Sequence, residues 1–465
     1  MRREWREHIP SVLVAALSAA FGVALLEITT VLSQSIAAND VTGSSGYVHV
    51  LLDIVAFVFI AIAIYVSAIV TSNTFATVIA GRTRTIALFR LIGSSASDQR
   101  KAVAREGLRV GILGALLGMI VGTAVTMILT TIAIARGVIP GIGYHLVPPV
   151  VFLPVAAVIL TTWLASWIGS RRVLDVSPME ATGSAVERTT EQAGHRRGRN
   201  VIASVLFLGG IAALVLGMLV GLVNPLGVLI GVVGGILSFT GLVLGAQLVM
   251  PVALRLTGRM FGRTAPARLA AENAVRYPER SSRSTIGLVI GVTLVTMFAV
   301  ALESMQAMIK AAHDAEPGTY AGTDTVLTSV VVIFSVLIGF SALIAAIGMV
   351  NTLSLSVLQR TREIGLLRAL GFTAKQVRTM ILAESAQLTI AAVVVGLVLG
   401  TFYGWAGAQS LLGTMSGGPG LVPPVLPLGL LVAVVAGSAI LIAAASVTPS
   451  RRATRIAPVA ALSVQ

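Results

Sequence analysis

Ten apolar runs, each long enough to cross a bilayer as a helix, constrain the fold of this chain more than any other feature. A hydrocarbon core of roughly 30 Å needs about 20 consecutive apolar residues in a helix. Because 56% of the residues are hydrophobic and only 11% are charged, far from the composition of soluble domains, we expect an all-α polytopic membrane protein. The ten predicted transmembrane helices are 11–32, 51–70, 111–135, 150–168, 201–223, 226–249, 285–302, 326–350, 382–405 and 426–447.

The basic residues fall almost entirely in one class of loop. Of the 33 Lys and Arg, only Arg136 and Lys310 lie in the other class. The positive-inside bias predicts that the basic side is the cytoplasm of a bacterial plasma membrane and that both termini lie there. Orientation and anionic headgroups therefore account for the net charge of +14, so we expect membrane lipid rather than nucleic acid as a partner. The outer loops are too short to fold into a domain.

The chain repeats itself at an offset of 278 positions, without a gap over more than thirty residues. The aligned identities include Asn73 with Asn351, Arg82 with Arg360, Arg90 with Arg368, Gly93 with Gly371 and Glu106 with Glu384. Both repeats have the same orientation, which predicts a pseudo-twofold axis along the membrane normal. The predicted layout is a four-helix repeat at 1–175, a cytoplasmic linker at 176–200, an inserted transmembrane hairpin at 201–250, a linker with a candidate interfacial helix at 251–284, and a second four-helix repeat at 285–465.

Each repeat contains a helix stop followed at once by a helix start. Gly371 is placed where a helix C-cap favours a residue that tolerates positive φ, and Thr373 can cap the helix that follows. The first repeat carries the same signals at Gly93 and at Ser94 or Ser95. We expect a stiff helix that extends beyond the membrane and carries a short, exposed, transverse helix, once in each repeat. Such a geometry can transmit force to or from a soluble partner.

The second copy resembles the signature of the FtsX-like permease domain of type VII ABC transporters. The residues that carry the resemblance are Asn351-Thr352 and Arg360-Thr361-Arg362-Glu363-Ile364-Gly365-Leu366-Leu367-Arg368-Ala369-Leu370-Gly371. The first copy is looser, with Thr85 and Ala87 where the pattern has Glu and Gly. The resemblance implies a permease moved by two copies of a separate cytoplasmic ABC ATPase. The implied ATPase-coupling residues are Ser94, Ser95, Ala96, Asp98, Gln99, Thr373, Ala374, Lys375 and Gln376, and the implied rod residues are Arg82, Arg84, Arg90, Arg360, Arg362, Glu363 and Arg368.

The chain itself lacks the motif of an ATPase. None of its three lysines, Lys101, Lys310 and Lys375, follows a glycine, so it has no P-loop. The five histidines show no ligand spacing, and there are no cysteines. We therefore expect no enzyme activity, catalytic residue, metal or cofactor in this chain, with ATP and magnesium bound by the partner ATPase.

The predicted function is export or extraction of a hydrophobic or amphipathic compound, such as a drug, an antimicrobial peptide or a lipid, by mechanotransmission. The alternative is a device that transports nothing and relays the state of the ATPase to an extracytoplasmic protein such as a cell-wall hydrolase. Glu27 and Glu303, late in the first helix of each repeat, are candidates for a substrate path, although carboxylates near a helix end can also reach the headgroups. Glycines four apart, Gly118 with Gly122 and Gly396 with Gly400, predict close helix packing.

Overall fold

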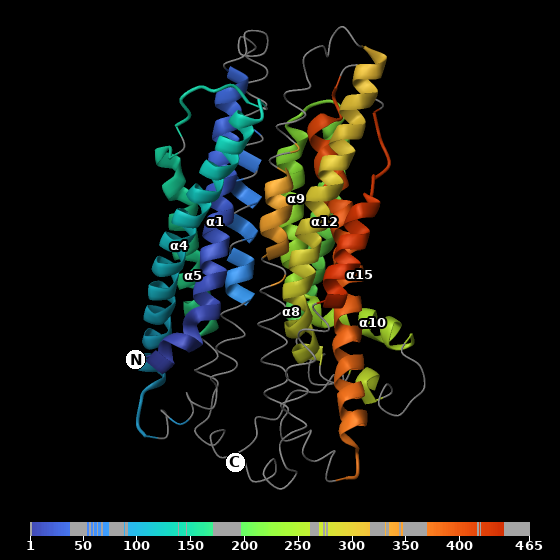
Figure 1. The fold of residues 1–465 in the computed structure, drawn as a ribbon. Coiled ribbons are helices and arrows are strands. Elements are labelled where there is room, and N and C mark those ends of the chain that lie inside the picture. Colours follow the sequence, from blue (N-terminus) through green and yellow to red (C-terminus); the bar gives the residue numbers. More distant parts are fainter. Residues whose placement is uncertain are drawn as a thin grey trace.

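The structure, a computed structural model, consists of long helices that run side by side (Figure 1). It describes residues 2–37, 92–170 apart from 138 and 146, 197–260, 278–316 and 370–440 apart from 416, 417 and 419, with parts of 54–88, 269–275 and 331–346. The main helices are α1 (Arg2–Ala37), α4 (Ala96–Ala135), α5 (Phe152–Gly169), α8 (Arg197–Gly221), α9 (Gly227–Leu244), α10 (Ala246–Gly258), α12 (Pro278–Ala315) and α15 (Ala374–Leu412). The 3-10 turn η1 (Pro149–Val151) leads into α5.

Seven helices in the described residues are long and apolar enough to cross a membrane. They are Ser11–Ser35, Ser97–Ala135, Pro149–Ile168, Gly198–Gly221, Gly227–Leu244, Thr285–Ala315 and Ala374–Leu412. Shorter apolar helices at Ile60–Asn73, Phe334–Leu343 and Leu428–Ile440 coincide with the three remaining predicted runs. An all-α, multi-pass membrane protein is therefore confirmed, while the count of ten and the arrangement of four, two and four helices stay predictions.

Large apolar side chains cover the outer faces of several helices. On α4, Ile120 is 63% exposed and Met127 is 59% exposed, and on α8, Leu208 is 65% exposed. A soluble protein rarely leaves contiguous apolar patches of this kind in water. These faces are the surfaces that a hydrocarbon environment would cover.

Glycines bring the first and third helices of each repeat into close contact. A Cβ atom on Gly118 of α4 would lie 2.3 Å from the carbonyl oxygen of Ala16 on α1. A Cβ on Gly400 of α15 would lie 2.6 Å from the carbonyl oxygen of Thr293 on α12. Gly122 and Gly396 face the same two neighbouring helices at 2.8 Å. The predicted role of all four glycines in helix packing is confirmed, because no larger residue fits these contacts.

One prediction about local structure is wrong. The segments after Gly93 and Gly371 were expected to form short transverse helices, separate from the apolar helices that follow. Instead α4 and α15 are continuous over 40 and 39 residues. No proline interrupts either sequence, so the backbone hydrogen bonds of the helix continue from the polar start into the apolar run.

Helices α8 and α9 form a hairpin whose turn is fixed by Asn224, since its Oδ1 accepts a hydrogen bond from the Leu226 backbone N–H at 2.9 Å. The sixth predicted run does not continue to Val249 as one helix, because it breaks at Gly245. Helix α10 then lies across the long helices beside α15 (Figure 1). Its Leu254 is buried against the bundle whereas Leu256 is exposed, and the location of a helix of this region at the membrane interface stays a prediction.

Candidate functional site

The two stop-and-start signals adopt the same backbone geometry. Gly93 has φ of 98° and Gly371 has φ of 99°, in the region that glycine adopts without steric cost. Ser95 and Thr373, which follow by two residues in each copy, are extended, with ψ of 150° and 155°. Helices α4 and α15 start at the next residue, and both starts lie at the same end of the bundle (Figure 1).

Side chains cap both helices in the same way. Ser95 Oγ accepts a hydrogen bond from the Asp98 backbone N–H at 3.1 Å. Thr373 Oγ1 accepts one from the Gln376 backbone N–H at 3.2 Å, and Gln376 Oε1 accepts one from the Thr373 N–H at 2.9 Å. These bonds satisfy amide groups that a helix start leaves unpaired. Of the two candidate serines, Ser95 is therefore the cap.

The remaining predicted coupling residues lie around these caps. Ser94 Oγ accepts a hydrogen bond from Gln99 Nε2 at 2.9 Å, which stiffens the turn before α4. Ala96 and Ala374 are the first residues of α4 and α15, and Lys375 is exposed. The predicted rod residues lie outside the described residues: Arg82, Arg84, Arg90, Arg360, Arg362, Glu363 and Arg368.

Two exposed apolar residues at these turns were not predicted from the sequence. Ile92 is 80% exposed and Leu370 is 72% exposed, and each directly precedes the glycine of positive φ. They occupy equivalent positions, 278 residues apart. In the sequence they look like ordinary last residues of an apolar helix face, and their only signal was their recurrence at the repeat offset. The candidate coupling surface thus has an apolar residue next to a polar cap in each copy.

The two carboxylates proposed for a substrate path occupy different environments. Glu27 is fully buried in α1 and accepts a hydrogen bond from Thr123 of α4 through Oε1 at 2.6 Å. Its Oε2 is buried and finds no hydrogen-bond partner in the part of the chain that the structure describes. Glu303 of α12 is only half-buried. Neither residue lines the cavity described next, so their role in a path stays a prediction.

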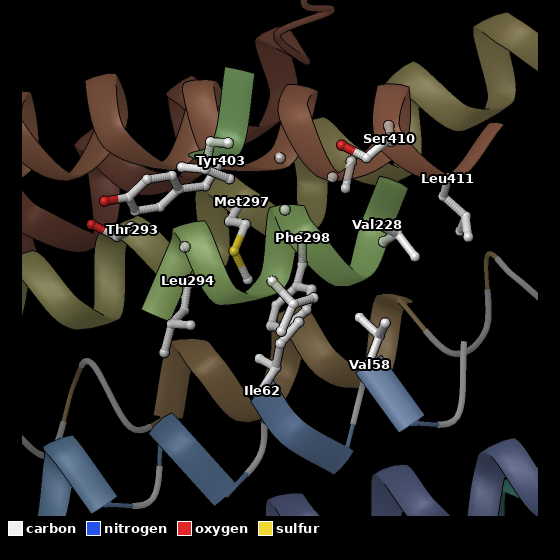
Figure 2. Close-up of a pocket in the computed structure, with 18 of the residues that line it drawn as sticks. Val58, Ile62, Val228, Thr293, Leu294, Met297, Phe298, Tyr403, Ser410 and Leu411 are labelled. Atoms are coloured by element: carbon white, nitrogen blue, oxygen red, sulfur yellow. The ribbon is translucent and has the colours of Figure 1, made fainter. Parts of the chain in front are cut away.

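An apolar cavity of about 260 Å³ lies between the two repeats and the hairpin. Its walls come from helix segment 58–69, from α9, from α12 and from α15. Figure 2 shows Ile62 of this segment pointing toward Phe298 of α12. The described residues that line it include no Asp, Glu, Lys, Arg or His.

Two tyrosines that line the cavity hold α9 between the repeats. Tyr65, from the first repeat, donates a hydrogen bond to the Ile236 carbonyl at 3.1 Å and lies 2.9 Å from Thr240 Oγ1. Tyr403, on α15, accepts a hydrogen bond from Ser238 Oγ at 2.9 Å. The aromatic rings of both tyrosines also contact Phe239 edge to face. The hairpin is therefore bonded to both repeats rather than packed on their outside.

The FtsX-like permease C-terminal family matches residues 57–178 and 335–458, just over half of the chain. The chain belongs to the FtsX-like permease family. The two matches start 278 residues apart, which is the offset found in the sequence, and each covers a capped turn. The first match also covers the cavity-lining segment 58–69. In this FtsX-like permease, α1, α12 and the hairpin lie outside the matched residues.

Two curated relatives are ABC transporter permeases of Bacillus subtilis strain 168. This FtsX-like permease is 35% identical over 102 residues to the uncharacterized ABC transporter permease YknZ, which is 22% of this chain and 24% of that protein. It is 40% identical over 57 residues to the ABC transporter permease YtrF, which is 12% of this chain and 13% of that protein. The similarity thus spans about a quarter or less of the relatives' length.

Proposed function

We propose that this FtsX-like permease is the transmembrane subunit of an ABC transporter. It couples ATP hydrolysis by a separate cytoplasmic ATPase, bound in two copies, to the export or extraction of a hydrophobic or amphipathic compound across a bacterial plasma membrane. The observation that carries this proposal is the duplicated turn, with Gly93 and Ser95 in one repeat and Gly371 and Thr373 in the other. Two equivalent surfaces at one end of a bundle suit two copies of one soluble partner.

The continuous helices supply a route for mechanotransmission. Helix α15 has 39 residues and is therefore about 60 Å long, reaching from Thr373 to the cavity. Gln387 of α15, which is buried, donates a hydrogen bond to the Leu254 carbonyl of α10 at 2.8 Å. Ser282 of α12 bonds to the Ala246 carbonyl, also in α10, at 3.1 Å. A displacement of the capped end of α15 would therefore move α10 and, through it, the α9 wall of the cavity.

The cavity favours transport over the relay to an extracytoplasmic protein. A relay needs only rigid helices and an outer surface to grip, and it has no use for an apolar space between the two repeats. A transporter of hydrophobic compounds needs such a space. Its apolar lining disfavours entry of a charged or strongly hydrated solute, because the solute would lose its hydration there. The lining of this cavity, which contains Phe298, Met297 and Leu294 among others, has that character.

The proposal is tested by affinity purification of the chain from its native membrane in mild detergent, with quantitative mass spectrometry of the bound proteins. We expect an ABC ATPase at two copies per chain. Changing Ile92 or Leu370 to Asp should weaken that association by more than tenfold, because truncation of a central interface residue costs roughly 2 kcal/mol or more. The matched control is Val223→Asp, since Val223 is 85% exposed at the turn of the hairpin.

Each outcome of this purification bears on the proposal. Wild-type chain that retains no ATPase would contradict it, and so would Ile92→Asp and Leu370→Asp variants that retain as much ATPase as wild type. Loss of the ATPase in the Val223→Asp control as well would place the contact away from the capped turns. A secreted or membrane-anchored hydrolase that copurifies with the ATPase would favour the relay.

A further inference from the structure

The hairpin of α8 and α9 has no counterpart in either repeat, yet it forms one wall of the apolar cavity. We propose that α9 completes a binding site for the hydrocarbon chain of a membrane lipid, and that the cavity is this site. A lipid chain as the transported ligand rests on the proposed function, whereas binding of a lipid chain in the cavity does not.

The lining offers almost no free hydrogen-bonding groups. The hydroxyls of Tyr65 and Tyr403 are bonded to α9, and Ser410 Oγ donates to the Ala406 carbonyl at 2.6 Å. An ordered water needs two to four polar partners, and apolar cavities of about 150 Å³ stay dry and bind small hydrocarbons. At about 260 Å³, this cavity is large enough for several methylene groups but unsuited to a charged headgroup.

A single hydroxyl on the lining is buried without a hydrogen bond to the described residues, that of Thr293 on α12. Its side chain is 1% exposed and is drawn at the edge of the cavity in Figure 2. One donor can satisfy one acceptor atom but cannot replace the hydration of a phosphate or an ammonium group. The cavity thus fits a chain, with the headgroup left outside it.

Glycines keep part of the cavity open. A Cβ atom added to Gly235 of α9 or to Gly407 of α15 would meet no atom of the described residues within 4 Å, although both glycines line the cavity. By contrast, a Cβ on Gly404 would lie 2.3 Å from the Met297 carbonyl oxygen, so that glycine is required for packing. The space beside Gly235 and Gly407 is therefore open at the Cβ position, and we expect a larger side chain at either position to extend into the cavity.

The experiment uses the purified chain without any ATPase, in phosphatidylglycerol nanodiscs that contain a trace of phospholipid with a photoreactive diazirine at the end of one acyl chain. After illumination, labelled peptides are mapped by mass spectrometry. We expect label on the cavity-lining parts of α9, α12 and α15. Gly235→Leu and Gly407→Leu should each reduce that label by about tenfold or more, because every displaced methylene changes affinity roughly fourfold.

Two controls make the result specific. Gly209→Leu adds the same side chain to the hairpin at an exposed position of α8, where a Cβ meets no atom of the described residues within 4 Å. This variant should be labelled to the same extent as wild type. Thr293→Val keeps the shape of the lining and should change the label by no more than about twofold, since a hydrocarbon accepts no hydrogen bond from the hydroxyl.

If the lining parts of α9, α12 and α15 carry equal label in wild type, Gly235→Leu and Gly407→Leu, the proposal is overturned. Such label would come from lipid outside the cavity, because filling the cavity did not reduce it. A large loss in Thr293→Val with none in the leucine variants would also overturn it, in favour of a polar ligand. Because the labelling experiment contains no ATPase, its result can be interpreted even if the earlier purification recovers no ATPase. The site and the proposed transporter can therefore fail separately.

Discussion

At the scale of single residues, the most informative observation is that Ser95 and Thr373 make the same cap. Each accepts a hydrogen bond from the backbone N–H three residues later, and each follows a glycine of positive φ by two residues. The neighbouring Ser94 does not cap, because its oxygen accepts from the Gln99 side chain instead. Local hydrogen bonding thus sets where α4 and α15 begin.

Ser95→Ala and Thr373→Ala should each weaken the start of their helix by about 1 kcal/mol, the usual loss for an N-cap. That loss predicts about fivefold faster amide hydrogen exchange in the first turn of α4 or α15, with little change deeper in the helix. Ser94→Ala is the matched control and should leave exchange in α4 nearly unchanged. Equal effects of Ser94→Ala and Ser95→Ala would contradict the assignment of the cap.

At the scale of helices, close contact through glycine joins the first and third helices of each repeat. The backbones of α1 and α4 meet at Gly118, and those of α12 and α15 meet at Gly400. In hydrocarbon, helices associate through such packing rather than through burial of apolar surface, because lipid is as apolar as the side chains. The pairing of these helices therefore depends on small residues at a few positions.

Gly118→Leu and Gly400→Leu should lower the stability of the folded protein by about 1 to 3 kcal/mol each, as expected for overpacking of a tight contact. Thermal unfolding of the purified chain in detergent, followed by tryptophan fluorescence, measures this change. Gly437→Leu is a control, since a Cβ there meets no atom within 4 Å in the part of the chain that the structure describes. An equal loss in the control would show that leucine itself, rather than the contact, destabilises the bundle.

At the scale of the whole molecule, the caps and the basic residues predict one orientation in the membrane. The charge asymmetry predicts that the capped starts of α4 and α15 lie on the cytoplasmic side and that Arg136 and Lys310 lie on the other side. Arg136 directly follows the end of α4 that is opposite its cap, and Lys310 lies in the last part of α12.

Because the chain contains no cysteine, single cysteines can report sidedness without background. Ser97→Cys and Lys375→Cys should react with a membrane-impermeant maleimide only in inside-out vesicles. Arg136→Cys and Lys310→Cys, also at exposed positions, should react only in right-side-out vesicles or intact cells. Reaction of all four from the same side would contradict the predicted topology, and with it the docking of a cytoplasmic ATPase at the caps.

The sequence by itself determined that the chain is helical and crosses a membrane, that it is duplicated, and where two helices start. These features depend on the length of an apolar run or on residues three positions apart, such as Thr373 and Gln376, so they can be read without knowing how helices pack. The continuity of α15 could also have been read from the absence of proline, although a separate short helix was expected. The exposure of Ile92 and Leu370 could not be predicted from the sequence, because it depends on which other segments pack around each turn.

Only the tertiary structure decided that a cavity exists and that α9 forms one of its walls. Tyr65 and Thr240 are 175 residues apart, and Gln387 and Leu254 are 133 residues apart, so no local pattern links them. In a soluble domain, the alternation of polar and apolar residues would show which helix face is buried. Here nearly every face is apolar, whether it meets lipid, another helix or the cavity. Only the placement of the helices separates those environments.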